Sequence, residues 1–125
     1  MKAKHVLFIL AVFWALLGCR TEVESHAYSQ FSLAFERQQE AVEILRTHLE
    51  TPAEAPKLLK KLRSKHAEAI HTFRGTNLTL KKQLRDEDHE ALGKERDRIF
   101  EELNDVLGRY PASVVVEVRY ILQTI

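Results

Sequence analysis

Apolar residues recur at the spacing of an α-helix between residues 28 and 49. Successive members stand three, four, seven, three and four positions apart, and they are Tyr28, Phe31, Phe35, Val42, Leu45 and Leu49. This period places them on one face of a helix, while charged residues such as Glu36 and Arg37 occupy the other faces. The pattern predicts a long amphipathic helix that begins near His26 and needs partner helices to cover its apolar face.

Two prolines end that helix and position the next one. Pro52 and Pro56 stand four positions apart, and they cannot both lie inside a helix, because proline lacks an N–H and clashes with the preceding turn. Pro56 fits the first turn of a second helix. The apolar stripe of this helix consists of Leu59, Leu62, His66, Ala69 and Phe73. Gly75 is the expected stop at its C-terminal end, and the short connection predicts an antiparallel helical hairpin.

The following segment contains at least one more helix. Thr76 or Asn77 can cap its start. The acidic run 86–90 would also favour a helix N-terminus. The sequence therefore leaves open whether residues 77–108 form one helix or two with a break near Arg85.

The C-terminal tail follows Gly108 and Pro111, which end the preceding apolar stripe. Three consecutive valines raise its strand propensity, but a lone strand would have no partner in a helical protein. Five apolar residues also fit one helical face behind Ser113 as a possible cap: Val114, Val118, Ile121, Leu122 and Ile125. We therefore expect a short final helix. The chain is predicted to be all-α, a small antiparallel bundle of three or four helices over residues 26–125.

The first eighteen residues differ in composition from the rest. Lys2 and Lys4 make the start positive, and an unbroken apolar run of twelve residues extends from Val6 to Leu17. This order is that of a secretory signal peptide. Twelve helical residues span about 18 Å, against roughly 30 Å of hydrocarbon core. The run therefore favours a cleaved signal peptide over a stable membrane span.

The apolar run ends in Leu16-Leu17-Gly18-Cys19, which contains the only cysteine of the chain. This segment resembles the lipobox of bacterial lipoprotein precursors, and the resemblance covers about the first twenty residues. It implies that signal peptidase II recognises Leu16, Gly18 and Cys19 and cuts before the cysteine. It also implies a diacylglycerol on the thiol and an acylated α-amino group. Two or three acyl chains make membrane attachment stable, whereas one would be marginal.

The resemblance also divides the chain and predicts where it resides. Residues 1–18 would be the signal peptide, residues 19–25 a lipidated tether and residues 26–125 the helical domain. The residue after the cysteine is Arg20 rather than an aspartate. By analogy, this predicts that the lipoprotein is sorted to the outer membrane, with the domain facing the periplasm.

Composition argues against several classes of function. Because Lys2 and Lys4 are the only charged residues before Cys19, the remaining chain carries seventeen Lys and Arg against eighteen Asp and Glu. This lacks the basic excess of a nucleic-acid binder. His66 and His71 are five positions apart and diverge around a helix, and no C-x-x-C-H haem motif occurs. No G-x-S-x-G elbow or glycine-rich phosphate loop is present either. We expect no metal, no other cofactor and no enzymatic activity.

Two segments carry opposite charge. Lys57–Arg74 is basic, while Asp86–Asp105 holds nine acids against three bases. A basic helix can bind anionic lipid head groups. The simpler interpretation, which we favour, is that it faces the acidic helix within the bundle.

The sequence thus predicts a non-enzymatic helical module that lipid on Cys19 holds in the bacterial cell envelope. Such a module would bind another protein or have a structural role. The alternative is a periplasmic bundle that binds haem, a metal ion or a small hydrophobic molecule. A cavity between helices lined by His66 or His48 would favour this alternative.

Overall fold

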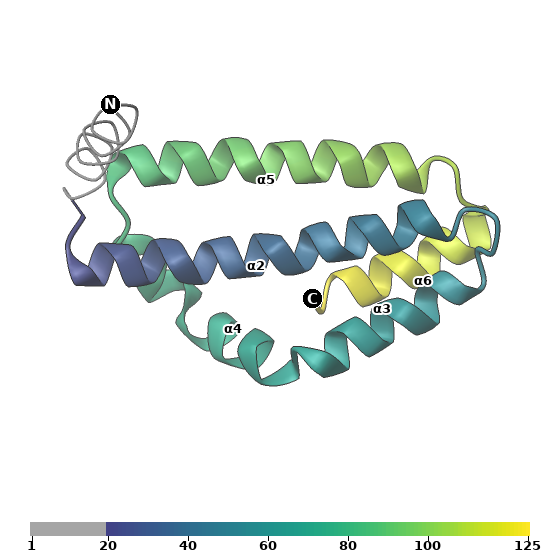
Figure 1. The fold of residues 1–125 in the computed structure, drawn as a ribbon, viewed down its shortest axis with the longest axis horizontal. Helices are drawn as coiled ribbons and strands as arrows, with labels where there is room; N and C mark the ends of the chain where they lie inside the picture. Colours follow the sequence, from purple (N-terminus) through teal and green to yellow (C-terminus); the bar gives the residue numbers. More distant parts are fainter. Residues whose placement is uncertain (1–19) are drawn as a thin grey trace, which may run out of the picture.

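The structure is a computed structural model that describes residues 20–125. This part of the chain forms five helices joined by short links and contains no strand. The helices are α2 (Glu22–Thr47), α3 (Glu54–Lys65), α4 (Ala67–Lys82), α5 (Asp86–Leu107) and α6 (Ala112–Leu122), as Figure 1 shows. The all-α prediction is confirmed, with five helices where three or four were expected.

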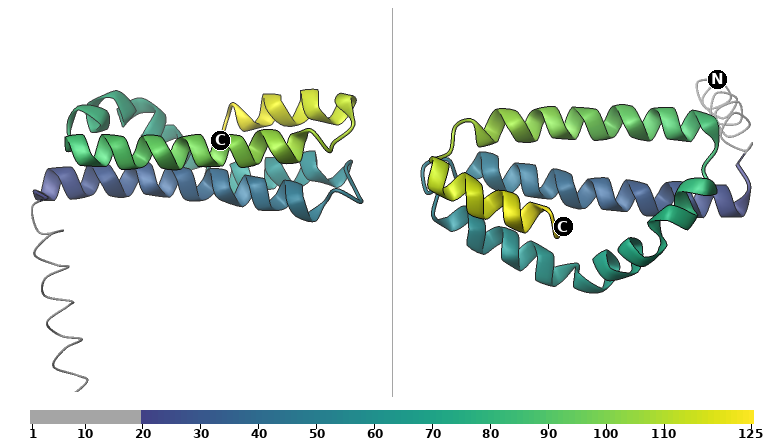
Figure 2. Two further views of the ribbon diagram at one scale, coloured as in Figure 1. Left: turned by 90° about the horizontal axis from the view of Figure 1, so that it is seen from above. Right: turned by 180° about the vertical axis from the view of Figure 1, so that it is seen from behind.

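The chain passes back and forth along the length of the molecule. α2 runs one way, α3 and α4 return together, α5 runs out again and α6 returns part of the way (Figure 1). Consecutive passes are antiparallel, as predicted, but the most extensive contact joins α2 and α5, which run in the same direction. α3 packs against α6, and both α3 and α4 lie against α2. α4 and α6 lie on one side of the α2–α5 pair, towards opposite ends of it (Figure 2).

α2 begins at Glu22, so the last four residues of the expected tether are helical. A capping box fixes this start. The Thr21 hydroxyl accepts a hydrogen bond from the Glu24 N–H at 3.1 Å, and the Glu24 carboxylate accepts one from the Thr21 N–H at 3.0 Å. The apolar stripe on which the sequence prediction was based starts only at Tyr28. For this reason the predicted start near His26 is four residues later than the observed start at Glu22.

The second predicted helix is divided differently from the expectation. A break at His66 separates α3 from α4, and α4 then continues through Gly75. The predictions of Gly75 as a stop and of Thr76 or Asn77 as a cap are wrong, because all three lie inside α4. The longer helix buries Leu80 and packs along α2. Such packing offsets the cost of an interior glycine, which is roughly 1 kcal/mol.

The other boundaries agree better with the sequence. Residues 77–108 do not form one helix, since the chain breaks before α5, whose N-cap residue is Arg85. Gly108 and Pro111 separate α5 from α6, as predicted. The tail is helical, as expected, but Ser113 lies inside α6 and no side chain caps the helix.

The main core lies where α2, α3, α5 and α6 meet. Its buried members are Ala41, Leu45, Ala55, Leu59, Leu62, Val106, Leu107, Tyr110, Val118 and Ile121. Within it, the Tyr110 hydroxyl donates to the backbone oxygen of Leu45 at 2.5 Å, and burial raises the pKa of this tyrosine. Closer to the start of α2, the rings of Phe31 and Phe73 pack edge to face with centroids 5.1 Å apart. These contacts hold the α5–α6 link and α4, respectively, against α2.

Candidate functional site

A buried carboxylate lies at the end of the bundle where α2 and α5 begin. Asp88, in the first turn of α5, is only 2% exposed. Arg20 donates to it from Nε at 3.1 Å and from Nη2 at 2.7 Å. Arg85 donates from the same two atoms, each at 3.1 Å. Two guanidinium groups therefore hold one carboxylate in bidentate geometry, and we call this arrangement the arginine clamp.

The clamp favours the ionised form of Asp88. Burial alone raises the pKa of this carboxyl, but the hydrogen bonds and positive charges of Arg85 and Arg20 outweigh burial and bring the pKa below its ordinary value. The hydrogen bond to Asp88 in turn raises the pKa of Arg85. The three groups thus form a charged cluster that stays intact at neutral pH.

Arg20 is fixed by more than the carboxylate. Its guanidinium carbon lies 4.0 Å from the centroid of the Tyr28 ring in α2, which is a cation–π contact. The next residue, Thr21, is held by the capping box of α2. Arg20 and Thr21 are therefore both held in place against the bundle.

The residues of the predicted processing site, Leu16, Gly18 and Cys19, lie outside the described residues. Sequence analysis missed the clamp beside them. Arg85 and Asp88 have the i,i+3 spacing of a helical ion pair, which was a usable local signal. The third member, Arg20, is 68 positions from Asp88, and no local pattern connects the two.

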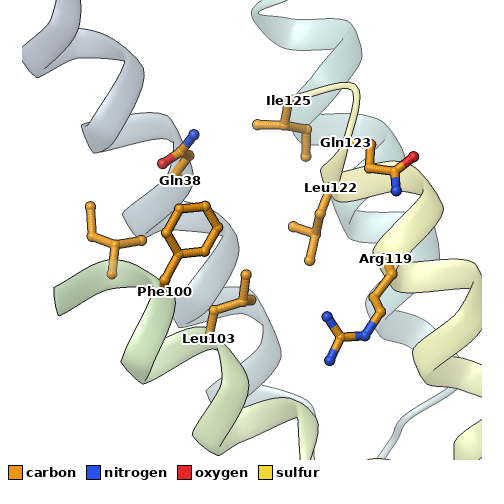
Figure 3. Close-up of a pocket in the computed structure, with 8 residues that line it drawn as sticks. Gln38, Phe100, Leu103, Arg119, Leu122, Gln123 and Ile125 are labelled. Carbon is orange, nitrogen blue, oxygen red and sulfur yellow. The ribbon is translucent and has the colours of Figure 1, made fainter. Parts of the chain in front are cut away.

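A second feature is an apolar groove between α5, α2 and the end of α6, with a volume of about 310 Å³. Its lining consists of Gln38, Ile99, Phe100, Leu103, Arg119, Leu122, Gln123 and Ile125. In Figure 3, Leu122 and Ile125 face Phe100 across the groove, and Arg119 extends from α6 towards α5. The groove thus combines aliphatic and aromatic walls with one cationic group, at the lower limit of volumes usual for ligand sites.

A neighbouring hollow of about 220 Å³ extends this apolar surface along α2 and α5 towards α4. It shares Gln38 with the groove, and its apolar lining includes Phe31, Phe35, Phe73 and Leu92. Lys81 and Arg96 also border it. The surface between α4 and the end of α6 is therefore mainly apolar with cations around it.

No histidine lines this groove. His66 does border a more open hollow of about 390 Å³ between α2 and α4, beside Gln30 and Glu68, as the ligand-binding alternative required. His48 Nδ1 lies 2.8 Å from the Ile44 carbonyl oxygen, which can only accept, so this nitrogen carries the hydrogen. His66 is half-buried at the α3–α4 break, as a boundary residue, with Nε2 at 3.8 Å from a Glu40 oxygen. His71 is exposed, as expected. Within residues 20–125, no group of three His, Cys, Asp or Glu side chains could hold a metal ion.

The opposite charges of the two segments are not paired against each other, so the favoured interpretation is wrong. α3 packs on α2 and α6, α4 packs on α2, and α5 also packs on α2. Figure 1 shows α5 and α3–α4 on opposite edges. Lys60 instead pairs with Glu117 of α6 at 3.4 Å. On the acidic edge, Glu102 pairs with Arg46 of α2 at 3.3 Å and with Arg98 of its own helix at 2.7 Å.

Among the described residues, no helix is both long and apolar enough to cross a membrane. No protein-family model matches this chain, and neither the curated proteins nor the solved structures give a significant match.

Proposed function

We propose that the chain is the precursor of a bacterial lipoprotein, in which lipid on Cys19 anchors a non-enzymatic helical module to the cell envelope. The proposal starts from the lipobox resemblance of Leu16, Gly18 and Cys19. The observation that supports it is the arginine clamp, which holds Arg20, the residue after the cysteine that the lipobox marks, against the bundle.

The location follows from the same resemblance. Arg20 at the position after the cysteine favours the outer membrane, with the bundle facing the periplasm. A role in protein interaction is supported by the exposed face of α6, where Val116 and Tyr120 stand one helical turn apart with more than two thirds of their surface exposed. Exposed apolar side chains that share a helix face are typical of partner contacts.

Metabolic labelling with a palmitate analogue in a bacterial host tests the anchor. We expect the wild-type chain to be labelled and to sediment with membranes, and the Cys19→Ser variant to lose the label. Leu17→Ala is the matched control, because the lipobox accepts small residues at that position, and it should label normally. Membrane sedimentation of Cys19→Ser equal to that of the wild type, without label in either, would contradict the proposal.

The second candidate function is binding of a small hydrophobic molecule, and the groove beside Phe100 favours it. A solvatochromic probe such as N-phenylnaphthylamine should gain fluorescence with the protein. Phe100→Ser should reduce this gain, because the ring forms a wall of the groove. Tyr120→Ser removes a more exposed aromatic ring outside the groove and should not reduce the gain. Equal effects of the two substitutions would remove this candidate.

A further inference from the structure

The attachment point of the proposed lipid is one peptide bond away from the folded bundle. Consecutive Cα atoms are about 3.8 Å apart, and Arg20, the residue bonded to the proposed lipidation site, is held by Asp88 and the Tyr28 ring. A flexible tether of seven residues, as the sequence predicted, would instead span roughly 13–16 Å on average. The lipid would therefore be joined to the bundle without slack.

The end of the bundle around the clamp, residues 20–25 and 78–88, is here called the clamp end. It carries two exposed aliphatic side chains, Val23 at 53% and Leu78 at 75% exposure. Its exposed charges are of both signs and include Lys82, Glu22 and Asp86. Such a surface tolerates contact with zwitterionic head groups, but it offers no excess of positive charge to attract anionic lipid.

We propose that the clamp end lies directly on the phospholipid surface and that the opposite end of the bundle projects away from it. This inference rests on the proposed lipidation of Cys19. α2 has 26 residues and is therefore about 39 Å long. The α2–α3 link, at the far end of α2, would therefore lie at about this distance from the membrane surface. The apolar groove would lie between this link and the clamp end.

A different orientation would follow if charge rather than the clamp positioned the domain. α3 carries four exposed lysines: Lys57, Lys60, Lys61 and Lys65. On a membrane rich in anionic lipid, they could draw the far half of the bundle down to the surface. That attraction would weaken with salt, whereas an orientation set by the clamp depends on neither salt nor lipid charge.

The experiment uses the full chain, lipidated in bacteria, purified and reconstituted into vesicles that contain rhodamine-labelled phosphatidylethanolamine. A donor dye is attached to a new cysteine at the clamp end (Lys82→Cys) or at the far end (Thr51→Cys), both at exposed positions. Energy transfer to the surface acceptor reports the height of each site. The thiol of a lipidated Cys19 cannot react, so one dye per chain verifies the lipid, and two dyes per chain would instead mean that the proposed function fails.

Three variants separate the clamp from other causes. Asp88→Asn removes the clamp carboxylate. Arg20→Gln releases the residue next to the lipidation site but leaves the Arg85–Asp88 pair in place. This second variant should therefore keep the fold if Asp88→Asn is too unstable to study. Asp97→Asn is the control, because this exposed carboxylate on the same helix pairs only with its neighbour, Arg96.

We expect transfer from position 82 to be several times more efficient than from position 51, in phosphatidylcholine vesicles and equally in vesicles with phosphatidylglycerol, at low and high salt. Arg20→Gln and Asp88→Asn should reduce this contrast, and Asp97→Asn should leave it unchanged. Equal transfer from both sites in the wild-type protein would overturn the proposal. The proposal would also be overturned if the difference in transfer between positions 82 and 51 survived both clamp variants. The same holds if this difference disappeared in anionic vesicles at low salt because the α3 lysines bring position 51 to the surface.

Discussion

Removal of the clamp carboxylate is expected to lower the free energy of unfolding by about 3 kcal/mol. Asp88→Asn keeps the size of the side chain but removes the charge on which the bonds from Arg20 and Arg85 depend. Loss of one partner from a buried ion pair costs roughly 3–5 kcal/mol, because the remaining charge stays uncompensated. The two arginines retain 18% and 17% exposure, so water reaches them and the lower end of this range applies.

The assay is thermal and urea unfolding of residues 19–125 with Cys19→Ser, followed by circular dichroism. A loss of about 3 kcal/mol lowers the midpoint temperature of a domain near 100 residues by roughly 12–20 °C. The control is Asp97→Asn on the same helix, whose partner Arg96 is 3.3 Å away in an exposed pair. Exposed pairs contribute about 1 kcal/mol or less, so this control should unfold close to the wild type.

The pH dependence separates the effect of charge from that of shape. The folded-state pKa of Asp88 lies below its ordinary value of 3.8. The ionised clamp therefore contributes its full stability above that ordinary value and loses it as the pH falls through the lower folded-state pKa. The difference between wild type and Asp88→Asn should be largest at neutral pH and shrink in acid. A difference that stays constant into acid, or an Asp88→Asn protein as stable as the Asp97→Asn control, would refute this reasoning.

Two further substitutions test the fold. Tyr110→Phe should lower the free energy of unfolding in urea by about 1–2 kcal/mol, because the buried Leu45 carbonyl loses its donor. The control Tyr120→Phe, at an exposed position, should change this free energy by less than about 0.5 kcal/mol. Equal losses in the two variants would contradict the prediction. Gly75→Ala should stabilise the protein by about 0.5–1 kcal/mol, since Gly75 lies inside α4 and no atom lies within 4 Å of an added Cβ. A lower midpoint for this variant would count against a continuous α4.

Local patterns predicted the helices well and their ends less well. The apolar periodicity and the Gly108–Pro111 stop are properties of neighbouring residues, so the C-terminal end of α5 and the helix α6 could be anticipated from the sequence, whereas the start of α5 stayed open. Gly75 failed as a stop because a glycine only permits a helix to end. Burial of Leu80 against the bundle decided that α4 continues. His66 gave no sign of the break in φ and ψ that separates α3 from α4.

The sequence by itself indicated that the chain is helical, and it supplied the resemblance of Leu16, Gly18 and Cys19 to a lipobox, because both patterns lie in short linear stretches. Only the tertiary structure decided which helices meet. α2 pairs with α5 in parallel, the basic α3–α4 edge lies opposite the acidic α5, and Arg20 reaches Asp88 across 68 positions. A helical period specifies which face is apolar but not which partner covers it, since that choice depends on how all the faces pack together. Residues 22–25 of the expected tether accordingly form the first turn of a capped helix.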